Sequence, residues 1–127
     1  MPITVELEPE QHRVSVVATG ALTQPERLAA LAQCIQLLRA HSGAGVLFDA
    51  RAATSAPSPA ETREIMDVAG GAAPVFVAGV AIVIAEGLQY GMARMLQALL
   101  EHRGVAVSVF TDIDAAAVWL GSASPEP

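Results

Sequence analysis

The fold is decided by residues 77–120, which read VAGVAIVIAEGLQYGMARMLQALLEHRGVAVSVFTDIDAAAVWL. Residues 80–84 are apolar without interruption, a pattern typical of a strand covered by helices on both faces of a parallel sheet. Residues 105–109 alternate valine with smaller residues and predict a second strand, and residues 111–114 have the spacing of a capping box that starts a last helix. Between the two strands lies a helical pattern whose predicted core face comprises Leu88, Met92, Met95, Leu96 and Leu99. This alternation of strands and helices predicts parallel strands joined by right-handed crossovers.

The preceding part of the chain is predicted to add a β-hairpin and two further helices with a strand between them. Residues 3–7 and 13–19 alternate apolar and polar side chains on either side of a short turn, which favours an antiparallel pair. Thr23 and Ser58 each stand three residues before a glutamate, with a proline in between, and so predict the starts of two helices. Residues 46–48 are the expected buried strand between these helices. The predicted core face of the first helix comprises Leu28, Leu31, Ile35 and Leu38, with Arg27 elsewhere on the helical wheel.

Together these elements predict an α/β fold in the order β-β-α-β-α-β-α-β-α, with a mixed, mostly parallel five-stranded sheet and packed helices. Residues 1–121 are expected to form a single domain and residues 122–127 a flexible tail. The chain has 127 residues, enough to bury a core, and 53% of them are hydrophobic. Because much of that share is alanine and valine, we expect helices packed closely on the sheet and no large aromatic ligand cage.

Charge and hydropathy argue against several classes of partner. The net charge is −6, and all seven basic residues are arginines that form no cluster. Binding to nucleic acid or to anionic membrane surfaces is therefore not expected, because both need clustered cations. The longest apolar stretch, residues 75–85, is much shorter than the roughly 20 residues of a membrane span. The charged start of the chain is unlike a signal peptide and a single cysteine fits a reducing compartment, so we expect a soluble, cytoplasmic protein.

No catalytic residue, metal site or cofactor is predicted. His12, His41 and His102 fall in turns or at helix ends, where an exposed imidazole is the ordinary case. The sequence has neither H-x-x-x-H nor C-x-x-C, and no nucleophile elbow, P-loop or dinucleotide fingerprint. Cys34 lies beside the core face of the first helix and is expected to be a small buried hydrophobe, since a reactive thiol would need exposure and a cationic neighbour. We therefore expect that the protein is not an enzyme.

A candidate ligand or partner site is expected at the carboxyl ends of the parallel strands, where open α/β sheets bind ligands. Two connections reach that edge, residues 49–58 and residues 85–91. The helix that begins in the second one has no good cap, which leaves N–H groups free for an anion or a partner. Arg51 adds a charge beside it, and the simpler alternative is that Asp49 and Arg51 pair with each other. The candidate residues are Asp49, Arg51, Ser55, Ser58, Glu86, Gly87 and Gln89.

A candidate interface lies on the polar face of the helix that follows residue 87. Tyrosine and arginine are favoured at protein contacts, and both occur on this face. The alternative is an ordinary solvated helix face. The residues in question are Tyr90, Arg94, Gln97 and Glu101.

The stretch VLFDAR at residues 46–51, together with residues 77–120, resembles the SpoIIAA-like family of small bacterial proteins. These share the fold of STAS domains and are grouped with CRAL-TRIO lipid-binding domains, and the correspondence runs over almost the whole chain. The resemblance implies binding or regulation rather than catalysis. Signalling STAS domains carry a phosphorylatable serine in a D-S-S-G-like loop, but residues 48–59 read FDARAATSAPSP, where that motif is absent. Ser58 is better explained as a helix cap.

Two functions follow from this reading. The first is a non-enzymatic, STAS-like regulatory or interaction domain whose partner is another protein or a second copy of the chain. The alternative is a small carrier that binds an apolar or lipid-like ligand between the sheet and the helix bearing Met92 and Met95. The carrier needs an internal apolar cavity of a few hundred Å³, and a solid core would exclude it.

Overall fold

The computed structural model describes residues 2–85 and 88–123, without the side chains of residues 88–90, 92, 93, 122 and 123. The predicted order of elements is confirmed. The strands are β1 (Ile3–Glu8), β2 (Arg13–Gly20), β3 (Gly45–Ala53), β4 (Val80–Val83) and β5 (Val107–Phe110). The helices are α1 (Gln24–Ala40), α2 (Pro59–Gly71), α3 (Leu88–His102) and α4 (Ile113–Ala123), with short 3₁₀ turns η1 (Pro9–Gln11) and η2 (Ala73–Phe76).

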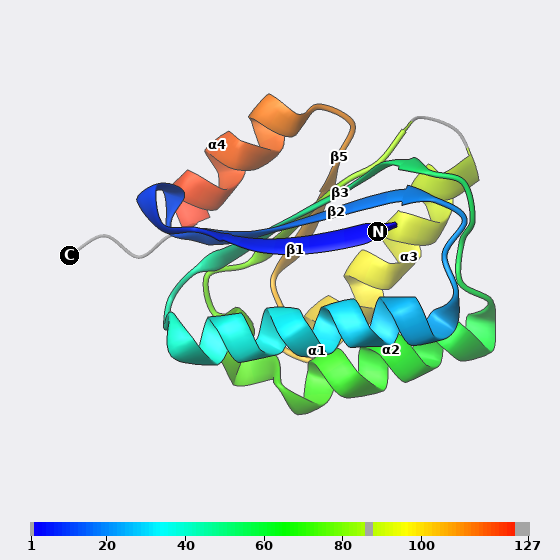
Figure 1. The fold of residues 1–127 in the computed structure, drawn as a ribbon, viewed down its shortest axis with the longest axis horizontal. Helices are drawn as coiled ribbons and strands as arrows, with labels where there is room; N and C mark the ends of the chain where they lie inside the picture. The colour runs from blue at the N-terminus through cyan, green and yellow to red at the C-terminus, as the bar shows by residue number, and fades with distance from the viewer. Residues whose placement is uncertain (1, 86–87, 124–127) are drawn as a thin grey trace.

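The five strands form one sheet in the order β1-β2-β3-β4-β5. β1 and β2 pair antiparallel as a hairpin, and every other neighbouring pair is parallel. Figure 1 shows α1 and α2 side by side on one face of the sheet and α4 on the other. α1 packs on β1 and β2, whereas α3 packs on β5 and on α2. The mixed, mostly parallel sheet with helices on both faces agrees with the predicted fold.

Two of the three expected helix caps are confirmed, and the third is displaced. The backbone N–H of Thr23 donates to Glu26 at 2.8 Å, and that of Ser58 donates to Glu61 at 2.9 Å, while each hydroxyl accepts from the glutamate's own N–H. These bonds to the cap backbone lower the pKa of both glutamates. α4, however, begins at Ile113, and the cap is the carboxylate of Asp112, which accepts from Asp114 N–H at 3.1 Å. Aspartate is as good a cap as threonine, so the pattern did not fix the residue.

Two element boundaries differ from those expected. β3 continues to Ala53 and so takes up the first half of the predicted loop 49–58, because β2 runs beside it as far as Gly20. α4 continues to Ala123, past the predicted helix end at Leu120. A glycine within a helix costs only about 1 kcal/mol, so Gly121 does not stop it. Residues 124–127 of the expected tail lie outside the described residues.

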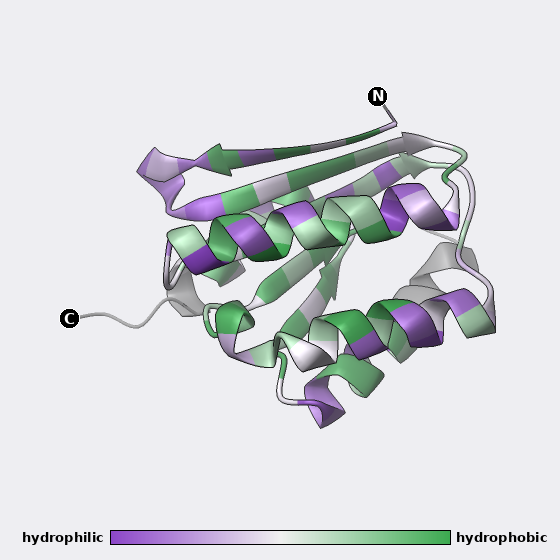
Figure 2. Ribbon diagram, turned by 60° about the horizontal axis from the view of Figure 1, so that its bottom comes forward, coloured by the Kyte–Doolittle hydropathy of each residue, from purple (hydrophilic) through white to green (hydrophobic). Residues whose placement is uncertain are grey.

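Apolar side chains fill both faces of the sheet. Val14, Val16 and Ala18 of β2 are buried toward α1, as their alternation predicts, and Leu38 of α1 is 2% exposed above them. A second, smaller cluster on the other face joins Leu47, Ala81, Val83, Ala116 and Leu120 beneath α4. Figure 2 shows the inner strands as largely hydrophobic and polar residues scattered over the outer sides of the helices. Among the described residues, no helix has the length and apolarity to cross a membrane.

The predicted core face of α3 is wrong in its second half. Met95 and Leu99 are 44% and 38% exposed, whereas Leu100 is only 6% exposed. Because α3 packs against β5 and α2 at the edge of the sheet, the buried stripe runs through Leu96 and Leu100. Leu96 of the predicted face is therefore retained, and Leu100 takes the place of Met95 and Leu99. The side chains of Leu88 and Met92 lie outside the described residues.

Candidate functional site: an apolar cavity

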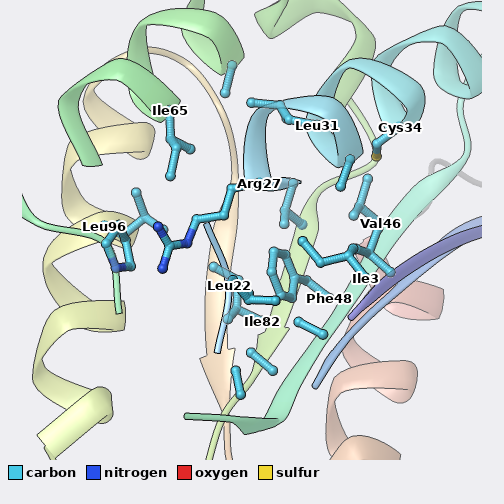
Figure 3. Close-up of a pocket in the computed structure, with 18 of the residues that line it drawn as sticks. Ile3, Leu22, Arg27, Leu31, Cys34, Val46, Phe48, Ile65, Ile82 and Leu96 are labelled. Atoms are coloured by element: carbon cyan, nitrogen blue, oxygen red, sulfur yellow. The ribbon is translucent and has the colours of Figure 1, made fainter. Parts of the chain in front are cut away.

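The core contains an apolar cavity of about 230 Å³ between the sheet and the helices α1, α2 and α3 (Figure 3). Here α2 packs mainly on α1 and α3. On this one face of the sheet α1 covers β1 and β2, α3 covers β5, and α2 lies between the two helices above the middle strands. The space beneath α2 is therefore bordered by Phe48 of β3 and Ile82 of β4 without being filled by them.

Small side chains keep this space open. Alanines line it from β2, β3, α1, α2 and the loop between β3 and α2, namely Ala18, Ala30, Ala50, Ala53, Ala56 and Ala69. The expectation that an alanine-rich core packs its helices closely on the sheet is thus wrong for α2. A methyl group reaches only a short way from the backbone, so alanines facing one another across a helix–sheet contact leave volume unless the helix moves inward.

The cavity is elongated along the strands. At one end it is lined by Phe76 and Val80, and at the other by Ile84 and Ala56. Val80 to Ile84 alone is about 13 Å of extended chain at about 3.3 Å per residue. Ala56 is exposed, so the cavity reaches the surface at the carboxyl edge of the sheet, which is where a ligand was expected to enter.

One charged side chain projects into this apolar space. Arg27 lines the cavity from the first turns of α1, and its side chain is 10% exposed. Nη1 donates to Gln24 Oε1 and Nη2 to Ser55 Oγ, each at 3.3 Å, and the nearest carboxylate oxygen is Glu61 Oε1 at 3.7 Å from Nη1. Figure 3 shows the guanidinium extending away from α1 toward Leu96.

A second polar group is Thr62, which lines the cavity from α2 and is 5% exposed. Its Oγ1 is buried and has no hydrogen-bond partner among the described residues. Sequence reasoning missed both Thr62 and Arg27. For Arg27 a signal was present, since positions 27, 31, 34 and 38 share one helical face, and Leu31 and Cys34 line the cavity beside it.

The residues of the predicted site that the structure describes are divided between the cavity wall and the surface. Among those that the structure describes, Ser55 lines the cavity, whereas Asp49, Arg51 and Ser58 do not. The hydroxyl of Ser55 accepts from Leu22 N–H at 2.8 Å and from Arg27. Ser58 caps α2. Glu86 and Gly87 lie outside the described residues, as does the side chain of Gln89.

Asp49 and Arg51 form a two-point ion pair on β3, with Arg51 Nε and Nη2 at 2.9 and 2.8 Å from the two carboxylate oxygens. This is the simpler of the two alternatives drawn from the sequence. The hydrogen bonds from Arg51 lower the pKa of Asp49, and the same contact raises that of Arg51. Asp112 and Asp114 at the start of α4 add to the negative field on Arg51, so its charge is already compensated.

The residues of the candidate interface on α3 differ in how far they are exposed to solvent. Arg94 and Glu101 are exposed, whereas Gln97 is half-buried and its Oε1 has no hydrogen-bond partner among the described residues. The side chain of Tyr90 lies outside the described residues. The exposed face of α3 also includes Met95 and Leu99, so it is more apolar than the sequence pattern suggested.

Cys34 is buried in the cavity wall, and burial raises the pKa of its thiol to about 11. The reactive form is the thiolate, so alkylation of the folded protein by iodoacetamide at pH 8 is expected to be about 100-fold or more slower than in urea. Quenched alkylation followed by mass spectrometry measures both rates. Equal rates in the two conditions would show that this wall of the cavity opens freely to solvent.

Comparison with known proteins bears on the fold. No family model and no curated protein matches the sequence. A solved structure is similar with a TM-score of 0.64 and 20% sequence identity, over 93% of this chain and 91% of that one. It is an uncharacterised protein of the DUF3478 family with a SpoIIAA-like fold, from Shewanella loihica PV-4. The SpoIIAA-like fold expected from the sequence is thereby confirmed.

Proposed function

We propose that this protein is a carrier that holds one small apolar molecule in the cavity between the sheet and helices α1, α2 and α3. The observation that carries the proposal is the cavity itself, with its volume of about 230 Å³ and its mostly apolar lining. An engineered apolar cavity of about 150 Å³ in another protein binds benzene. By that scale the ligand here has on the order of ten non-hydrogen atoms.

The free-energy cost of an empty cavity supports the proposal that a ligand occupies it. Empty core volume costs about 24 cal/mol per Å³, so leaving this cavity of about 230 Å³ unfilled would cost up to about 5.5 kcal/mol. That is comparable with the whole stability of a small domain, about 5–15 kcal/mol. A ligand that fills the space recovers van der Waals contacts for its lining and stabilises the fold by binding the native state. The proposed ligand therefore acts as part of the core.

The first test is native mass spectrometry on protein purified gently from its own host, compared with the mass after denaturation. The carrier is expected to show extra mass, on the order of 150 Da, that is lost on denaturation. Extracting the ligand with organic solvent and refolding is expected to lower Tm, and adding the extract back is expected to restore it.

The opposite result is protein that carries no extra mass and whose Tm is unchanged by benzene or 1-octanol. That combination would rule out the carrier. A regulatory or interaction domain would then be the function to test, beginning with the exposed side chains of Arg94, Met95 and Leu99 on α3.

A further inference from the structure

We infer that the molecule held in the cavity carries a carboxylate and that Arg27 binds it. The inference rests on the proposed carrier function and names the chemical class of its ligand: a small carboxylic acid with an alkyl or aryl tail. Three observations on the described residues carry it: a single cationic side chain lines the cavity, that side chain is incompletely paired, and the hydroxyl of Thr62 has no hydrogen-bond partner.

The side chain of Arg27 is only 10% exposed, yet no carboxylate within the described residues lies at hydrogen-bond distance from its guanidinium. A guanidinium has five N–H donors, and within the described residues Arg27 uses two of them, each at 3.3 Å and each on a neutral oxygen. Charge-assisted bonds to a carboxylate are normally about 2.7–2.9 Å. A buried cation without a close counter-ion is costly, which makes the site favourable for an anion that enters the cavity.

Glu61 does not fill this role. Its Oε1 lies 3.7 Å from Arg27 Nη1, beyond hydrogen-bond distance, and the same oxygen accepts the N–H of Ser58 at 2.9 Å. Moving the carboxylate toward Arg27 would break the capping box that starts α2. Glu61 therefore contributes a nearby negative charge without accepting a hydrogen bond from Arg27.

The unpartnered oxygen of Thr62 is an independent indication. A buried hydroxyl without a hydrogen bond costs about 1–3 kcal/mol, and such groups are rare in folded proteins. Thr62 follows Glu61 on α2 and lines the same cavity as Arg27. A carboxylate bound to the guanidinium offers an acceptor for this hydroxyl, so one ligand group satisfies two incompletely paired protein groups.

The charges favour a monoanion over a phosphate. Among the described lining residues a single arginine faces the cavity, Glu61 lies beside it, and the protein carries a net charge of −6. A dianion would leave excess negative charge in a low-dielectric space, whereas a carboxylate matches the planar guanidinium through two parallel hydrogen bonds. The remaining walls are apolar and elongated, so they fit the tail of an acid such as octanoate, which has ten non-hydrogen atoms.

The test compares octanoate with 1-octanol, which have the same chain length and differ in the charge of the head group. Titration calorimetry at pH 7 is expected to show octanoate binding about 10- to 100-fold more tightly than 1-octanol, the range expected for a hydrogen bond to a charged group. In Arg27→Met this preference is expected to disappear while 1-octanol still binds. Arg27→Lys is expected to keep part of the preference for octanoate. The control is Arg39→Met, on the exposed side of the same helix, which is expected to keep the full preference.

Two failures can be told apart. Equal affinity of the native protein for octanoate and 1-octanol would overturn the carboxylate inference and leave the carrier function standing. No binding of octanoate, 1-octanol or benzene would overturn both. Because the comparison of the two ligands uses the native protein, it decides the matter even if Arg27→Met does not fold. A preference for octanoate that persists in a folded Arg27→Met would assign the carboxylate to another residue.

Discussion

Ala30→Leu is expected to weaken ligand binding strongly while raising the stability of the ligand-free protein. Ala30 lines the cavity from α1, in the same helical stripe as Arg27 and Cys34. Leucine adds an isopropyl group to the empty space and is a good helix former, so it fills volume without disturbing α1. Cavity-filling substitutions commonly stabilise by about 0.5–2 kcal/mol. The same atoms then collide with a ligand, and overpacking costs about 1–3 kcal/mol, which corresponds to a roughly 10- to 100-fold loss of affinity.

The matched control is Ala29→Leu, which makes the same chemical change one residue away on the exposed side of α1. It is expected to leave both ligand binding and Tm within the scatter of the native protein. Octanoate titration and urea unfolding of the two ligand-free variants measure both effects. If Ala30→Leu loses stability and still binds as the native protein does, the ligand lies elsewhere and the cavity is not its site.

The arrangement of strands and helices could be predicted because it is encoded locally. Period-two alternation in residues 13–19 predicts β2, and the cap-and-glutamate spacings at Thr23 and Ser58 fix where α1 and α2 begin. The residue at which a strand ends depends less on the local sequence. β3 extends to Ala53 because β2 lies alongside it, and nothing in the sequence of residues 49–53 predicts that pairing.

The cavity could not be predicted in the same way because it depends on the distance between α2 and the sheet. An apolar stripe indicates which side of a helix faces inward, and it does not say whether the opposite wall is in contact. The alanines at 50, 53 and 69 look alike in sequence whether they pack or border empty space. Arg27 was misjudged for a related reason: a charged residue on a core-facing stripe is ordinarily read as solvent-exposed, although its spacing from Leu31 and Cys34 placed it inside.

Leu38→Ala and Leu31→Ala are expected to differ sharply in cost, although both remove the same atoms from the inner side of α1. Leu38 is 2% exposed in the closely packed part of the core, so truncation creates a new cavity and is expected to cost about 2–5 kcal/mol. Leu31 already borders the empty space. Its truncation loses mainly the transfer free energy of a partly buried side chain, about 1–2 kcal/mol, and enlarges a cavity that exists in any case.

Urea unfolding of the ligand-free proteins measures both losses, provided that the m-values stay unchanged. Leu31→Ala is further expected to shift ligand preference toward a longer chain, because its enlarged cavity accepts more methylene groups at about 0.8 kcal/mol each. The ratio of decanoate affinity to octanoate affinity should then be higher in Leu31→Ala than in the native protein. Leu38→Ala should leave that ratio unchanged. Equal stability losses for the two variants would mean that α2 settles onto the sheet in solution. The alanine-lined space would then be closed unless a ligand holds it open, and ligand binding itself would have to separate α2 from the sheet.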